Sequence, residues 1–79
     1  PSSEVVIVMF DVPERERGKR QWIRLSLRAM GFTMAQRSVW IGKAKIPSAF
    51  LADLRRLRLV RYVEIFSVNR KGSLQRQLQ

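Results

Sequence analysis

The feature that most constrains the fold is an apolar run near the start of the chain, Glu4 to Phe10, which reads Glu-Val-Val-Ile-Val-Met-Phe. The run is rich in β-branched residues and too short for a typical helix, so it predicts a strand. Val5, Ile7 and Met9 alternate with an equally apolar second set, so both faces of this strand need a cover. We therefore expect it to be the central strand of a sheet.

The rest of the chain alternates between helical and strand patterns. It predicts a helix from Arg15 to Met30 and then a hairpin of two strands, Phe32 to Gln36 and Ser38 to Gly42. A second helix begins at Ile46 to Ser48, and a last strand runs from Val60 to Val68. This order is the split βαβ plan. The sequence therefore predicts an α+β, ferredoxin-like βαββαβ domain, in which a four-stranded antiparallel sheet carries both helices on one face. One domain spans residues 1–79, with a core over about 4–68 and a basic tail over 69–79.

The face of this sheet without helices would still be apolar. A second copy of the chain is the simplest cover, because a twofold axis lets one patch bury itself. We expect a homodimer whose interface contains Val5, Ile7, Met9, Tyr62 and Phe66.

The charge balance indicates a polyanionic partner. Sixteen Lys or Arg against six Asp or Glu give a formal net charge of +10, which is typical of domains that bind nucleic acid, here double-stranded DNA. The chain has neither cysteine nor histidine, which excludes disulfides, thiolate-bound zinc and histidine-based triads. It also lacks a long apolar stretch and a signal-peptide layout, so we expect a cytoplasmic protein that does not enter the membrane. The missing initiating Met suggests excision from a longer polypeptide.

Arginines recur at helical spacing along the first predicted helix. Arg17, Arg20, Arg24 and Arg28 share one face, and Arg37 lies in the segment between the two predicted hairpin strands. These five residues are the candidate phosphate contacts. The alternative is an ordinary solvated helix face, although like charges at these spacings repel one another.

Asp11 follows the central strand and is the one carboxylate placed for chemistry. Paired copies across a twofold axis could hold Mg²⁺ or Mn²⁺ and activate water for phosphodiester cleavage. The alternative, which we favour, is a capping box with Glu14 at the start of the first helix, with Pro13 in its first turn. We expect no cofactor and no catalysis unless Asp11 binds metal.

Several segments together resemble a known family. The chain is similar to the CRISPR-associated-protein-two-like domain of PaaX-type transcriptional regulators over nearly its whole length: Val6 to Glu14, Gly31-Phe32, Gln36 to Ile41, Phe50-Leu51, Tyr62 to Phe66 and Lys71 to Leu74. The resemblance implies a regulator of the phenylacetate-repressor type whose parent chain also carries a winged helix-turn-helix domain that reads DNA.

The same fold is shared with the CRISPR adaptation family, some members of which are described as metal-dependent nucleases acting on DNA or RNA. This chain resembles them at Asp11 and at Ser38-Val39. It departs from them at Phe10, where that family commonly has Tyr, and after Val39, where it commonly has an acid. The regulator is therefore our leading hypothesis, and a CRISPR adaptation protein for spacer acquisition is the alternative.

Overall fold

The computed structural model describes residues 4–69 and 72–77. In chain order the elements are β1 (Val5–Phe10), a 3₁₀ helix (Glu14–Glu16), α1 (Arg17–Ala29), β2 (Thr33–Gln36), β3 (Val39–Gly42), α2 (Ser48–Arg56), a second 3₁₀ helix (Val60–Tyr62), β4 (Val63–Val68) and β5 (Leu74–Arg76). Neither helix in this described part is long and apolar enough to cross a membrane.

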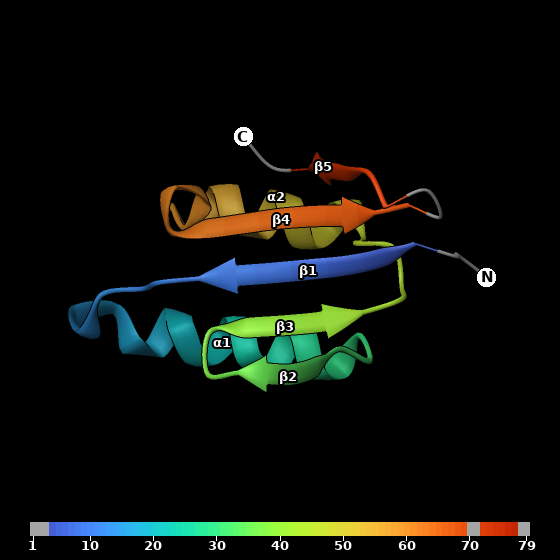
Figure 1. Ribbon diagram of the computed structural model, residues 1–79. Coiled ribbons are helices and arrows are strands. Elements are labelled where there is room, and N and C mark those ends of the chain that lie inside the picture. The colour runs from blue at the N-terminus through green and yellow to red at the C-terminus, as the bar shows by residue number, and fades with distance from the viewer. Residues whose placement is uncertain (1–3, 70–71, 78–79) are drawn as a thin grey trace.

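The strands form one antiparallel sheet in the order β2-β3-β1-β4-β5 (Figure 1). The expected α+β class and the central place of β1 are confirmed, whereas the expected count of four strands is wrong. The fifth strand comes from the segment expected to be a tail. Its polar sequence lacks the apolar alternation that marks a strand, and it is ordered instead by pairing with β4. Gln77 completes this edge, because its backbone N–H donates to Ile65 O at 2.8 Å and its Nε2 donates to Ser67 Oγ at 2.9 Å.

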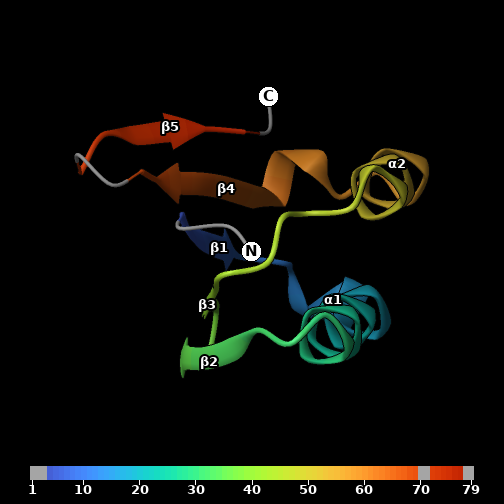
Figure 2. The same cartoon turned by 90° about the vertical axis from the view of Figure 1, so that its right-hand side faces the viewer.

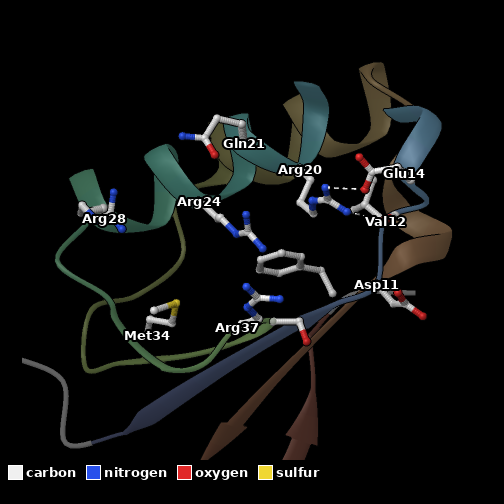
Figure 3. A pocket seen from close by; sticks show the side chains of 11 residues that line it. Asp11, Val12, Glu14, Arg20, Gln21, Arg24, Arg28, Met34 and Arg37 are labelled. Atoms are coloured by element: carbon white, nitrogen blue, oxygen red, sulfur yellow. Dashed lines mark hydrogen bonds and ion pairs between the residues drawn. The ribbon is translucent and has the colours of Figure 1, made fainter. Parts of the chain in front are cut away.

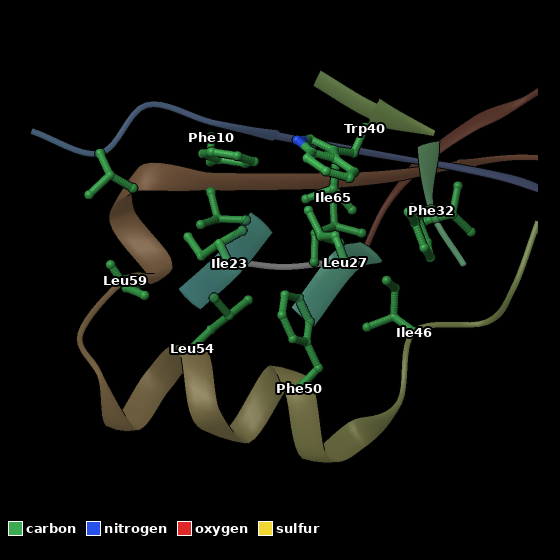
Figure 4. Packing of buried hydrophobic residues seen from close by; sticks show 14 residues of the cluster. Phe10, Ile23, Leu27, Phe32, Trp40, Ile46, Phe50, Leu54, Leu59 and Ile65 are labelled. Atoms are coloured by element: carbon green, nitrogen blue, oxygen red, sulfur yellow. The ribbon is translucent and has the colours of Figure 1, made fainter. Parts of the chain in front are cut away.

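Both helices cover the same face of the sheet (Figure 2). On β1, Val6, Val8 and Phe10 are buried, while the residues between them are only partly buried. The core between the layers takes residues from every predicted element (Figure 4), and its members are Val6, Val8, Phe10, Val12, Ile23, Leu27, Phe32, Trp40, Ile46, Phe50, Leu54, Leu59, Val63 and Ile65.

The end of α1 sets the entry of the next strand. Gly31 has φ +88°, its N–H donates to Arg28 O, and the N–H of Phe32 donates to Leu27 O, both at 3.0 Å. These two bonds make a Schellman motif, in which a left-handed residue closes the last carbonyls of a helix. The motif turns Phe32 into the core, where it is 4% exposed. Gly31 therefore ends the helix, directly after Met30, the last residue of the predicted helix.

The hairpin of β2 and β3 brings its turn to the end of β1. Its register shifts between Met34 and Gln36, so the strand carries an irregularity of the kind that re-aims side chains. The N–H of Phe10 donates to Ser38 O at 3.0 Å. This bond holds the Arg37-Ser38 turn beside the end of β1.

Candidate functional site

A basic cleft of about 650 Å³ lies between α1 and the β2–β3 turn, at the end of β1 (Figure 3). Its lining combines four arginines with two carboxylates and a few neutral residues, namely Phe10, Asp11, Val12, Glu14, Arg20, Gln21, Arg24, Arg28, Met34, Arg37 and Ser38. The cleft joins segments that are distant in the sequence, so it exists only in the folded chain.

Three of the four arginines come from one face of α1. Arg20, Arg24 and Arg28 follow at intervals of four residues and therefore stack along the helix. Ile23 and Leu27, on the neighbouring face, are fully buried and fix the rotation of α1 on the sheet. Packing of the apolar stripe therefore directs this arginine row along the cleft, and Arg37 meets it from the turn.

Arg20 is already neutralised. Its Nη2 donates to Glu14 Oε1 at 2.9 Å and its Nη1 donates to Val12 O at 3.3 Å. The Arg20 guanidinium holds the pKa of Glu14 below its ordinary value of 4.5. Arg17 also lies 3.6 Å from Glu14, is 78% exposed and does not line the cleft. The structure thus separates Arg17 from the other predicted contacts.

The other three cleft arginines form no ion pair with any residue that the structure describes. Among residues 4–69 and 72–77, no carboxylate pairs with Arg24, Arg28 or Arg37. Arg24 Nε is buried and has no hydrogen-bond partner within that part of the chain. A buried donor without a partner costs free energy unless a ligand or water accepts from it.

Arg28 is held by an aromatic ring. Its guanidinium carbon lies 5.5 Å from the centroid of Trp40, which is 1% exposed, and such a cation–π contact attracts the charge to the ring face. Met34 adds a half-exposed apolar side chain, with 50% of its surface accessible. The cleft can therefore hold an anion and tolerate an apolar group beside it.

Asp11 is exposed and lies at the opposite end of the cleft lining from Arg28 (Figure 3). The capping-box expectation is wrong: the 3₁₀ helix begins after Pro13, and no side chain caps it. Glu14, the other member of the expected box, turns to Arg20 instead of back to the backbone. The backbone N–H of Asp11 donates to Tyr62 O at 2.9 Å.

A metal site at Asp11 finds no further support within one chain. No three Asp or Glu side chains gather anywhere in the described ranges. The catalytic and metal-binding roles of Asp11 remain predictions that depend on a second copy.

The open face of the sheet is apolar. Val5, Ile7 and Met9 are partly buried, and Ile7 lies between Ile41 on β3 and Phe66 on β4. Residues opposite one another in a sheet share a face, so a continuous apolar strip crosses three strands.

One compensated charge pair borders this strip. Arg76 on β5 pairs with Glu64 at 3.2 Å and lies 5.3 Å from the ring of Phe66. Tyr62 is placed differently from the other expected interface residues, because it lies in the second 3₁₀ helix and packs against the core.

Sequence reasoning missed several cleft residues, including Gln21, Met34 and Ser38. It also missed that Glu14 neutralises Arg20, since the two lie six residues apart across a 3₁₀-to-α junction, outside regular helical spacing. The sequence singled out the helical row of arginines, Arg37, and Asp11 with Glu14, but it did not show that they line one cleft.

Comparison with known protein families finds a match over nearly the whole chain. The family described as the PaaX protein central Cas2-like domain matches residues 5–78. No curated protein and no solved structure shows significant similarity to the chain.

Proposed function

The chain belongs to the PaaX protein central Cas2-like domain family, and from this membership we propose that it is the dimerising, nucleic-acid-associating domain of a PaaX-type transcriptional regulator. The domain acts by binding rather than by catalysis, needs no cofactor and works in the cytoplasm. In the full regulator a separate winged-helix domain reads the operator sequence. Membership in this family does not favour the alternative, a CRISPR adaptation nuclease.

The basic cleft carries the proposal for nucleic acid. Arg24, Arg28 and Arg37 present guanidinium groups that no carboxylate of the described chain neutralises. Arginine binds phosphate through paired N–H donors and stays charged at any physiological pH. These contacts do not depend on base identity, so they add affinity for DNA and leave sequence readout to another domain.

The salt dependence of binding tests this role. The affinity for a short double-stranded DNA should fall with salt, by about 0.9 log units per log unit of salt for each phosphate contact. An Arg24→Gln/Arg37→Gln variant should weaken binding and flatten the slope by at least about 0.9. Fluorescence anisotropy across a salt series gives both quantities.

A charge-matched control separates the cleft from the general basic charge. Lys43 and Lys45 lie after β3, at the end of that strand away from the Arg37-Ser38 turn, and outside the cleft lining. Lys43→Gln/Lys45→Gln removes the same charge and should leave the slope nearly unchanged. If both double variants flatten the slope equally, or if the wild type does not bind DNA, the proposed role of the cleft is wrong.

The open sheet face carries the proposal for dimerisation. Its strip around Ile7 is apolar, and the pair that borders it, Glu64 with Arg76, is internally compensated. A second copy of this strongly basic chain can approach this face with little charge repulsion, whereas the basic cleft would repel it. Full burial of an exposed apolar side chain contributes about 1.5–3 kcal/mol before association costs. The strand residues of this strip are already partly buried, so each contributes less than this, and a twofold axis counts each contribution twice.

Sedimentation tests the dimer. Ile7→Glu places a charge at the centre of the strip and should give a monomer. Leu25→Glu is the control, because Leu25 is 53% exposed on α1 and away from the open face. A wild-type monomer at tens of micromolar concentration, a dimer that survives Ile7→Glu, or a dimer that Leu25→Glu dissociates as fully as Ile7→Glu does, would refute this interface.

A further inference from the structure

The cleft does not have the geometry of a track for a continuous phosphate backbone. The arginine row on α1 is met from the other side by Arg37, and in Figure 3 the side chains of Arg24 and Arg37 extend toward each other. Donors that converge from two elements can enclose one group. A concave site of about 650 Å³ is in the size range that encloses a small ligand, whereas a duplex touches a protein over a broad surface.

One end of the cleft lining offers no uncompensated cation from the described part of the chain. Glu14 lies there, paired with Arg20 at 2.9 Å, and Asp11 follows at the end of β1. A strand that continued through the cleft would find no free guanidinium of the described residues for its next phosphate at this end, because Arg20 is paired with Glu14, and would meet the exposed carboxylate of Asp11, which repels it. The arrangement favours a strand that stops in the cleft.

The charge of the lining fits a phosphate at a strand end. Four arginines against two carboxylates leave a net charge of +2. A phosphate monoester carries about −1.5 to −2 near neutral pH, whereas each phosphodiester within a strand carries one negative charge. Arg24 Nε adds a buried donor that lacks a partner in the described ranges, and a monoester has more free oxygens with which to accept from it.

We propose that the cleft binds the terminal phosphate of a nucleic-acid strand, enclosed between Arg24 and Arg37. Arg28, held over Trp40 at the outer end, contacts the following phosphate of the same strand. This inference rests on the proposed association with nucleic acid and specifies which part of the nucleic acid the cleft takes.

The test compares the affinity for three forms of one duplex DNA. The first has open ends that carry a terminal phosphate, prepared separately with 5′ and with 3′ phosphates; the second has open ends with hydroxyl groups; the third is covalently closed by hairpin caps. At least one phosphorylated form should bind roughly tenfold or more tightly than the hydroxyl-ended form, because charge-assisted hydrogen bonds are among the stronger ones. The closed form should bind no better than the hydroxyl-ended one. If all forms bind equally, the end preference is overturned, while the proposed association with DNA stands.

Variants locate the preference. Arg24→Gln and Arg37→Gln should each abolish the advantage of the phosphorylated end, and the double variant should lose no more than either single one, because both side chains hold the same phosphate. Lys43→Gln/Lys45→Gln should retain the advantage. Retention of the advantage by Arg24→Gln/Arg37→Gln would place the terminal phosphate elsewhere and overturn the assignment.

Inorganic phosphate distinguishes the strand from its phosphate group alone. It should compete with the phosphorylated duplex more strongly than sodium chloride of the same ionic strength, and should bind by itself much more weakly than the duplex. If inorganic phosphate binds as tightly as the duplex, the strand contributes nothing and a free phosphate is the ligand.

Discussion

The close contact between Gly42 and Phe32 predicts that a larger residue at position 42 lowers the stability of the fold. Gly42 is buried in β3 opposite Val6, and the ring of Phe32 lies over the place where a side chain would stand. A Cβ added at Gly42 would be 2.7–2.8 Å from three ring carbons of Phe32. Real Cβ atoms essentially never come so close, so either the ring or the strand must move in a Gly42→Ala variant.

The expected cost follows from the size of such a rearrangement. Overpacking a well-packed core by one methyl group destabilises proteins by about 1–3 kcal/mol. In a domain of this length each kcal/mol lowers the melting temperature by about 4–8 °C. Gly18 provides the opposite case: it lies in α1, and nothing stands within 4 Å of an added Cβ. Gly18→Ala should therefore stabilise the fold by up to about 1 kcal/mol.

Urea denaturation followed by far-ultraviolet circular dichroism measures both variants at one protein concentration, which matters if folding is coupled to association. A double-mutant cycle identifies the contact: Gly42→Ala should cost less in the Phe32→Leu background, because the flat ring no longer occupies the space. If Gly42→Ala is as stable as wild type, or if Phe32→Leu leaves its cost unchanged, the packing argument fails.

Three further outcomes follow from the charged groups around the cleft. Glu14→Gln should release Arg20 and tighten DNA binding by up to about fivefold, whereas Glu16→Gln, which removes the same charge next to Lys19, should change anisotropy titrations much less. The hydrogen bonds that Glu14 and Glu16 accept from these cations lower the pKa values of both carboxyl groups in the folded state. Their contribution to the free energy of unfolding should be complete above the unfolded pKa, near 4.5, and should disappear as the pH falls through the folded pKa values. Chemical denaturation at a series of pH values measures this trend, and a stability that does not change over this pH range would contradict it. Asp11→Ala and Asp11→Asn should both be about as stable as wild type, because the Asp11 side chain caps no helix. Incubation of the wild type with DNA or RNA and Mg²⁺, Mn²⁺ or chelator should reveal no metal-dependent cleavage. Cleavage that Asp11→Asn abolishes would support the nuclease alternative.

Local patterns were enough for the elements that bury an apolar face. The run from Val5 to Phe10 predicted the central strand, and the range from Arg15 to Met30 predicted the helix that contains α1. Such predictions succeed because burial follows the period of the backbone, which is a property of neighbouring residues. The arginine row on α1 was visible for the same reason.

The sequence by itself thus determined the α+β class, the central strand, the basic charge and the family that the chain resembles. Only the tertiary structure decided that residues 74–76 form a fifth strand, that Glu14 neutralises Arg20 and that Arg37 meets Arg24 across a cleft. The physical reason is that these features depend on pairing between distant segments. The strand register and the geometry at the end of α1 determine which side chains meet. The periodicity of one segment carries no information about which residues of a distant segment will contact it.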